Sequence, residues 1–431
     1  MKHRIIVHAM IVFVMISCGK KQSLIEKSLI DSSIANYSRD FNKIAKFLEN
    51  DLNFWKNRTI GQPADIVNSV KYAALLISKF QITGDVNYIH QSDSILFEVS
   101  KNYNHKESSI FSSLSNHYIL QHRFHEADSL FKKADSLGLK TYNKLSQAFD
   151  IYFELGLFQL AEKSLLKLNQ TNDFGYQFRI SKLMHYKGDL DSSINAMTAA
   201  TQLVSKNETL LQNAQSNLAD LYLHDNDVKN AYFNYKVCLQ KNASDLHSLM
   251  GLGWLALVHD GNDSLAKHIF EFAATKTLLP DPIFKLVSWA QFNNDTINEL
   301  HFAQLFEQKA AQNIYGNMYN KYLILLYTQI LNNPLKAVEL ARKEIINRAT
   351  PQTYSWLVYS LAFNKEFDEA DKLYKEFVEG KPLEGLELYY MGKYMLAKNK
   401  IYNAKQYFKE AAKNKYDLSP RIMDDINKLL N

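Results

Sequence analysis

The sequence predicts an all-α protein, a right-handed α-solenoid of about ten helix-turn-helix repeats. Two observations predict it. Only 14 of the 431 residues are Gly and only 7 are Pro, which favours long helices over β-sandwiches and disordered linkers. A small residue, alanine at eight of ten positions, also recurs between residues 89 and 404, at nine intervals that average 35 residues. A period of this length is typical of a helical repeat array.

The repeated unit combines a turn, an apolar residue and then the small residue, as in HRFHEADSLFKKA and KEFDEADKLYKEF. These segments resemble the tetratricopeptide repeat, a helix-turn-helix unit of about 34 residues. The resemblance implies that the small residue lies where helices A and B of one unit cross closely, since a larger side chain would separate them. The ten positions are Ile89, Ala127, Ala161, Ser193, Ala231, Ala266, Ala303, Ala337, Ala370 and Ala404. The units around Ala303 and Ala337 fit the pattern least well.

A bulky residue follows four positions after most of these small residues, and a second small residue follows three positions later. Cys238 occupies one of the latter positions. We therefore interpret it as a buried thiol that replaces alanine. The bulky residues are Phe131, Leu165, Met197, Tyr235, Phe270, Tyr374 and Phe408.

The first residues of the chain have the pattern of an export signal. Lys2 and Arg4 precede an almost wholly apolar run that ends at Cys18. The run is too short to cross a bilayer, which takes about 20 apolar residues, but it has the length of a secretory signal. The stretch MISCG resembles the lipobox of bacterial lipoproteins, which implies that Cys18 is acylated and becomes the new amino terminus. An ordinary cleaved signal with an incidental cysteine is the alternative.

The resemblance to lipoproteins also implies a location in a Gram-negative envelope. Gly19 follows Cys18 where an acidic residue would favour retention in the inner membrane, and no acidic cluster follows either. We therefore expect the protein on the outer membrane, at its periplasmic face. The formal net charge of +5 is too small to predict nucleic-acid binding.

These patterns divide the chain into five parts. Residues 1–17 form the signal peptide, 18–36 a lipidated tether, 37–69 an N-terminal capping helix, 70–418 the repeat array and 419–431 a C-terminal capping helix. Ser419 and Pro420 have the residue types of an N-cap and a first helical position. A terminal repeat needs such a cap because one of its faces has no neighbour.

The sequence contains no G-x-S-x-G elbow, P-loop, dinucleotide fingerprint or H-E-x-x-H motif, so we predict no enzyme and no cofactor. His117, His122, His125 and Glu126 are the best metal candidates, but the repeat register directs them differently, and we predict no metal site. The stretch HDGNDS at 259–264 is interpreted as a turn, because it lacks the alternating acidic residues of a calcium loop. The four tryptophans, Trp55, Trp254, Trp289 and Trp356, fit core packing better than a sugar-stacking platform.

Helix A lines the inner groove of such repeats. Its inward positions carry a polar set in the amino-terminal half and a tyrosine-rich set near the carboxyl end. Tyrosines suit peptide binding because they give a large contact area and a polar tip, although they could instead pack between neighbouring helices. The predicted groove residues are Asn143, Asp150, Asp220, Tyr319, Tyr322, Tyr359, Tyr389 and Lys393.

The leading hypothesis is a lipid-anchored scaffold that binds a peptide or a partner protein in this groove, as the family resemblance implies. The alternative is a helical glycan-binding lipoprotein that acts with an outer-membrane importer. Proteins of that kind interrupt their repeats with long insertions, whereas the largest interval here is 38 residues. The sequence therefore favours the scaffold.

Overall fold

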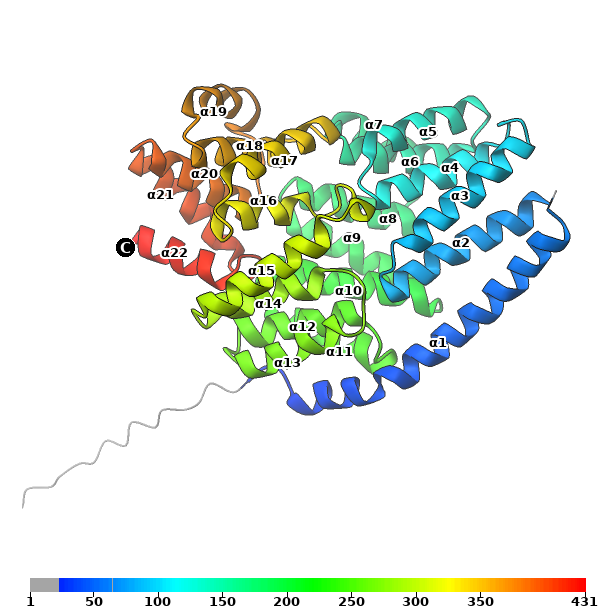
Figure 1. Ribbon diagram of the computed structural model, residues 1–431, viewed down its shortest axis with the longest axis horizontal. Coiled ribbons are helices and arrows are strands. Elements are labelled where there is room, and N and C mark those ends of the chain that lie inside the picture. The colour runs from blue at the N-terminus through cyan, green and yellow to red at the C-terminus, as the bar shows by residue number, and fades with distance from the viewer. Residues whose placement is uncertain (1–22, 64) are drawn as a thin grey trace, which may run out of the picture.

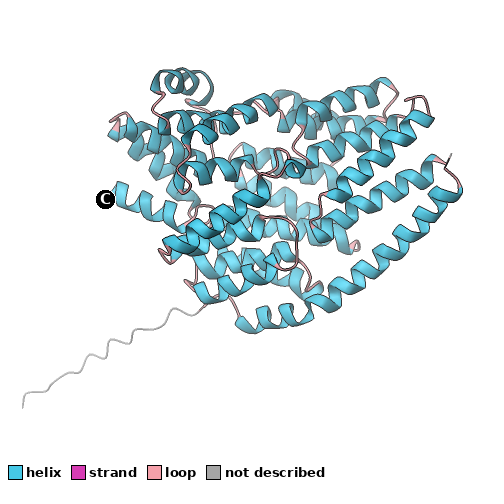
Figure 2. Cartoon of the chain, in the orientation of Figure 1, coloured by secondary structure: helices cyan, strands magenta, loops and turns pink. Residues whose placement is uncertain are grey.

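The computed structural model describes residues 23–63 and 65–431, and every regular element within these ranges is a helix (Figure 1, Figure 2). Ten helix pairs follow one another between Ile66 and Ala411, with a long helix before them and a short one after them. The two helices of each pair pack against each other. The predicted all-α repeat array is confirmed, and the chain is a series of tetratricopeptide-like helix pairs.

The first helices of the pairs are called helices A. They are α2 (Ile66–Thr83), α4 (Ser108–Leu120), α6 (Thr141–Glu154), α8 (Phe174–Tyr186), α10 (Glu208–His224), α12 (Leu246–Val258), α14 (Asp281–Phe292), α16 (Asn320–Gln329), α18 (Pro351–Phe363) and α20 (Gly385–Ala397). The second helices, helices B, are α3 (Asn87–Asn102), α5 (Phe124–Ser136), α7 (Phe158–Leu168), α9 (Leu190–Leu203), α11 (Val228–Lys241), α13 (Asp263–Ala274), α15 (Thr296–Ala310), α17 (Pro334–Asn347), α19 (Phe367–Leu373) and α21 (Ile401–Ala411). A π-helical turn, Tyr374–Val378, extends α19.

The residues predicted at the helix crossings are buried in every pair. All ten, from Ile89 to Ala404, have 0% exposure. The bulky residues four positions later are buried as well, and some of them fill the space above a glycine of helix A. A Cβ atom on Gly253, for example, would lie only 2.8 Å from the ring of Phe270. Cys238 is a buried free thiol, as predicted, and burial raises its pKa to about 12.

The N-terminal segment differs from the tether predicted for residues 18–36. Helix α1 (Lys27–Gly61) begins at Lys27 and runs for 35 residues along the outer edge of the array (Figure 1). Its first part packs on α11 and α13 and its second part on α2. Ile30, Ser33 and Tyr37 are buried, and this narrow stripe at helical spacing is hidden among polar residues in the sequence.

The chain before α1 is fixed to the turn between α12 and α13. The carboxylate of Asp260 accepts hydrogen bonds from the backbone nitrogens of Leu24 at 3.0 Å and Ile25 at 2.8 Å, and from the Ser23 hydroxyl at 2.6 Å. These bonds lower the pKa of Asp260 against the opposing effect of its burial. Residues 259–262 form a turn, as predicted, whereas Asp263 and Ser264 already belong to α13. The turn holds the start of the described chain. The predicted signal and Cys18 lie outside the described residues.

The array also closes on itself, because turns and helix ends meet others five or six pairs further along the chain. The Leu278 nitrogen donates to the Thr83 carbonyl at 3.0 Å. Gly84 has a φ of 71°, and a Cβ atom there would lie 2.9 Å from the Leu279 nitrogen. Three further bonds repeat this long-range pattern: Asn317 to the His122 carbonyl, the Phe124 nitrogen to Asn347, and Asn226 to the Lys413 carbonyl.

The last helix covers the end of the array and also reaches its inside. Helix α22 (Pro420–Leu430) begins with Ser419 as N-cap and Pro420 at the first helical position, as predicted. It packs on both α21 and α14, and Ile422 and Ile426 are buried. Arg421 forms an ion pair with Glu299 of α15. The cap therefore joins the last pair to the seventh.

The substitution Ala404→Leu should lower the free energy of unfolding by about 1–3 kcal/mol, because its side chain would overpack a helix crossing that has no free space. Ala370→Leu should act in the same way. Urea titrations followed by circular dichroism measure this change. Ala74→Leu is the control, because Ala74 is exposed on α2. Equal stability of the Ala404 and Ala74 variants would contradict the helix register.

Candidate functional site

The closed array encloses a cavity of about 640 Å³, a volume in the range of about 300–1,000 Å³ that ligand sites occupy. Helices α10, α12, α14 and α16 and the segments 383–386 and 414–419 supply most of its wall, and single residues of other helices, such as His185, Tyr235 and Phe306, supply the rest. A second cavity of about 270 Å³ shares His185, Lys321 and Glu384 with the first. Helix A of five or more successive pairs therefore faces one internal space.

Asp220 is the centre of a hydrogen-bond network in the wall of the larger cavity. It accepts from the Tyr235 hydroxyl and lies 2.9 Å from Nε2 of His247. Burial by the surrounding protein would lower the pKa of His247, but the hydrogen bond and charge of Asp220 outweigh this effect and raise it to about 9. The His247 side chain lies in the cavity wall and faces the cavity. For this reason 54% of that side chain is exposed, although protein surrounds it. Burial opposes ionisation of Asp220, but its hydrogen bonds with His247 and Tyr235 lower its pKa.

A second pair joins two distant parts of the wall. Nδ1 of His224 lies 2.6 Å from the carboxylate of Asp417, and the Trp254 indole donates to the Tyr416 carbonyl. Burial opposes protonation of His224, yet the hydrogen bond to Asp417 raises its pKa. The cavity thus lies beside the joint that closes the array.

Lys285 of α14 is the cationic group of the cavity without an acidic partner. Its ammonium lies 3.9 Å from the ring centroid of Trp254. The carboxylates of Asp220, Asp281 and Asp417 act on it only from a distance, and burial lowers its pKa to about 8. Contact with an aromatic face replaces only part of the lost hydration, and the ammonium has three hydrogen-bond donors. An anionic group that enters the cavity would bind here.

Three of the predicted groove residues line this cavity: Asp220, Tyr319 and Tyr322. The Tyr319 hydroxyl donates to Asp281 at 2.7 Å, and the tyrosine itself is buried. The ring of Tyr322 packs 4.6 Å from that of Phe284, and the side chain remains half-buried at the cavity wall. Tyr322 is therefore the most accessible aromatic anchor of the predicted set.

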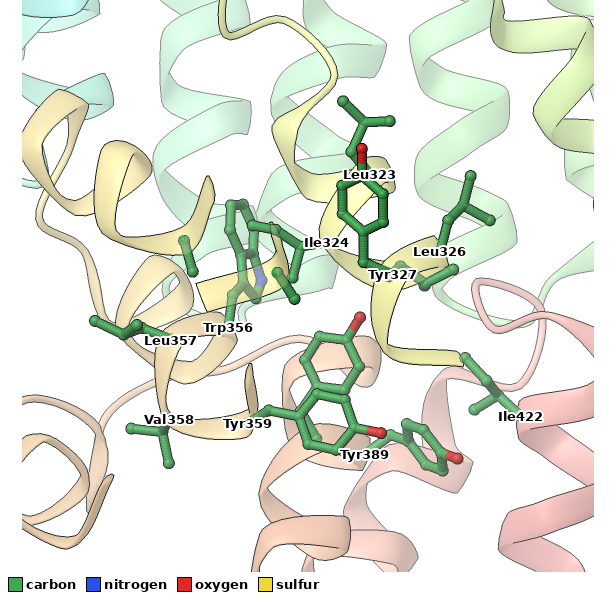
Figure 3. Close-up of a cluster of buried hydrophobic side chains, with 14 of the residues drawn as sticks. Leu323, Ile324, Leu326, Tyr327, Trp356, Leu357, Val358, Tyr359, Tyr389 and Ile422 are labelled. Atoms are coloured by element: carbon green, nitrogen blue, oxygen red, sulfur yellow. The ribbon is translucent and has the colours of Figure 1, made fainter. Parts of the chain in front are cut away.

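Tyr359, Tyr389 and Lys393 lie away from the cavity and are engaged by neighbouring helices. Tyr359 stacks on Tyr390 at 4.3 Å. The Tyr389 hydroxyl and the Lys393 ammonium both donate to Asp425 of α22, at 2.7 and 2.9 Å. Figure 3 shows Tyr359, Tyr389 and Ile422 in the buried cluster formed by α16, α18, α20 and α22. Helix α22 thus occupies the carboxyl-terminal part of the predicted groove.

The amino-terminal residues of the predicted groove do not meet at one place. Asn143 is exposed at the start of α6. Asp150 forms an ion pair with Arg179 of the next pair at 2.5 Å. These two residues remain predicted groove residues, but the structure does not bring them to the larger cavity.

The metal candidates are also apart. His117 bonds to Asp93 at 2.8 Å, His125 is exposed and Glu126 pairs with Arg123. His122 has a φ of 55° at its turn, and burial lowers its pKa. Within residues 23–63 and 65–431, no three His, Cys, Asp or Glu side chains are placed to hold a metal ion.

Lys285 was not among the predicted groove residues, although the repeat pattern contains the signal for it. Lys285 lies 18 residues before Ala303, the interval that also separates Tyr319 from Ala337 and Asn143 from Ala161. Extending the inward register to the poorly matching unit around Ala303 would have identified it. His247 and Trp254 fall outside this register, since the wall also uses positions beside the inward ones.

Comparisons with known proteins give little beyond the fold. No family model and no curated protein matches the chain. Solved structures overlap it loosely. Pseudomonas aeruginosa PilF is 10% identical and overlaps 50% of this chain and 97% of its own, with a TM-score of 0.37. Yeast Tom70 is 12% identical and overlaps 94% and 96%, with a TM-score of 0.39. The fold assignment therefore depends on the helix pairs of the chain itself.

Across the described residues, no helix combines the length and the apolar character that crossing a bilayer requires.

The pair of His247 and Asp220 should give the array a pH dependence. Because the pKa of His247 is raised from 6.5 to about 9, its interaction stabilises the fold fully below pH 6.5 and is lost as the pH rises through about 9. The free energy of unfolding of the native protein should therefore fall across this window. In His247→Gln the fall should be smaller, and in Asp220→Asn the His247 ring should titrate at lower pH by NMR. An unchanged ring titration in Asp220→Asn would contradict the pairing.

Proposed function

We propose that the protein is a lipid-anchored, non-catalytic scaffold of a Gram-negative envelope that binds an extended segment of a partner protein inside the array. The cavity at Lys285 is the observation that carries the proposal. An internal space with one unpaired ammonium, a half-buried tyrosine and walls of mixed polar and apolar side chains suits a chain segment with an acidic group. The lipid at Cys18 and the periplasmic face of the outer membrane complete the proposal, supported by the signal-like start of the sequence.

The pairing of the cavity side chains supports a binding role. Asp220 is bonded to Tyr235 and His247, His224 to Asp417, and Asp281 to Tyr319. These partners fix the orientation of one another's polar atoms. Such preorganised groups suit recognition, since fewer side chains lose freedom when a partner binds.

The tryptophan surroundings favour a protein partner over a glycan. A sugar stacks on a free aromatic face, but Lys285 covers Trp254 at 3.9 Å and Lys267 covers Trp289 at 4.4 Å. Near Trp356, Lys321 and Arg348 lie 5.8 and 5.7 Å from the ring centroid. Each tryptophan of the array thus already has a cation beside its ring.

Lys285→Met should strongly reduce recovery of the partner when the tagged protein is isolated from detergent-solubilised envelopes, because an acidic group would lose its only free counter-charge. Lys285→Arg should retain part of the recovery. The matched control is Lys267→Met, which removes a lysine from a tryptophan face on the outer helix α13. Mass spectrometry identifies the recovered species.

The outcomes separate the hypotheses. A protein recovered by the native chain and by Lys267→Met, but not by Lys285→Met, supports the proposal. Equal recovery by all variants would move the binding site away from the cavity. A recovered glycan in place of a protein would favour the glycan-binding alternative. Melting temperatures of the variants show whether a loss of recovery reflects unfolding.

Acylation is tested independently. Cells grown with a clickable fatty acid should label the native protein, and Cys18→Ala should abolish the label, because Cys18 would supply the thiol for the lipid. Label that persists in Cys18→Ala would exclude this anchor.

A further inference from the structure

The outer face of α1 carries two exposed aromatic side chains. Phe47 is 65% exposed and Phe54 is 53% exposed. They are seven residues apart, so they lie on the same face of the helix, roughly 10 Å from each other at 1.5 Å per residue. The ring of Trp55, which is half-buried, packs 5.1 Å from that of Phe54. Together these aromatic side chains form a candidate contact surface.

The charged residues around this pair are mostly basic. Lys43 and Lys46 are exposed on α1, and the Arg58 guanidinium lies 5.7 Å from the centroid of the Phe54 ring. Asp51, four residues after Phe47 and three before Phe54, is an exposed acidic residue on the same face. Two other nearby acidic residues are engaged by the array. Asp40 accepts from the Ala243 nitrogen at 2.9 Å, and Glu49 pairs with Lys79 at 2.8 Å. The exposed face of α1 thus combines phenylalanines with free ammonium groups, a composition typical of helices that lie in a membrane interface.

The position of α1 along the chain fits the same partner. Cys18 precedes Ser23 by five residues, which reach at most about 18 Å when extended. The Asp260 bonds hold Ser23, Leu24 and Ile25 on the array. From there α1 continues along the outer edge of the molecule (Figure 1). A lipid on Cys18 would therefore keep the start of α1 close to the bilayer surface.

We propose that α1 lies on the membrane surface, with Phe47 and Phe54 in the interfacial layer and the neighbouring lysines against anionic lipid headgroups. This inference rests on the proposed lipid anchor and extends it. A lipid alone leaves a protein free to swivel about its attachment, whereas a helix in contact over two turns fixes its orientation. The inner cavity is then held in one orientation relative to the membrane.

Trp55 provides the readout. The acylated protein is reconstituted into vesicles of phosphatidylethanolamine and phosphatidylglycerol whose acyl chains are brominated near the headgroups. Bromine quenches indole fluorescence at short range, so the native protein should lose fluorescence relative to unbrominated vesicles. Trp55→Phe should remove this loss, because Trp254, Trp289 and Trp356 lie inside the array.

The double variant Phe47→Asp with Phe54→Asp should reduce the quenching to the level of Trp55→Phe, whereas Phe47→Leu with Phe54→Leu should preserve it. The control is an exposed pair on other helices, Ile346→Asp with Tyr402→Asp, at 75% and 76% exposure in the native chain. Circular dichroism shows that each variant is folded. High salt should weaken the quenching, since the lysine contacts are electrostatic.

Two results would overturn the inference. One is quenching that the double aspartate variant leaves unchanged. The other is a vesicle-independent oligomer of the native protein that this variant dissociates in analytical ultracentrifugation, which would make the face a contact between two copies of the chain. Fatty-acid labelling at Cys18 is read separately. If the protein is labelled but Trp55 is not quenched, the proposed membrane contact of α1 is wrong and the lipid anchor stands. If the mature chain is unlabelled but Trp55 is still quenched, the lipid anchor is wrong and the membrane contact stands.

Discussion

The close crossing of two helices at a residue with no exposed surface is the constraint on which the rest of the structure depends. It recurs in all ten pairs, from Ile89 to Ala404. Stacked repeats curve and twist through a small rotation at each step. The curved path of this array brings turns from pairs five or six steps apart into contact.

The contacts between distant pairs change the character of the array. An open solenoid is quasi-one-dimensional, and each repeat touches only its neighbours. Here, bonds such as Leu278 to Thr83 and Asn226 to Lys413 link residues nearly 200 positions apart. The inner groove of an open array becomes a cavity. Burial in its wall lowers the pKa of Lys285, whereas the raised pKa of His247, which has 54% of its side chain exposed, depends on its hydrogen bond to Asp220.

The sequence was sufficient for the helix pairs, since alanines at a fixed period report directly on helix crossings. It could not predict closure, because the closing bonds use backbone carbonyls of Thr83, His122 and Lys413, which any residue type supplies. The irregular unit before Ala337 also has a physical reason: the loop before α16 carries Asn317, which bonds to the His122 carbonyl. Of the predicted groove, only the part near α10 and α16 reaches the cavity, because α22 fills the carboxyl-terminal part.

The bonds of Asp260 to Ser23, Leu24 and Ile25 also decide how a mechanical pull would act on the molecule. A pull through the residues before Ser23 reaches the array at its sixth of ten pairs, not at either end. A solenoid pulled from one end peels off repeat by repeat, since only one interface bears the tension at a time. Because the Asp260 bonds precede the first residue of α1, a pull on the N-terminal segment must break them before it can load α1.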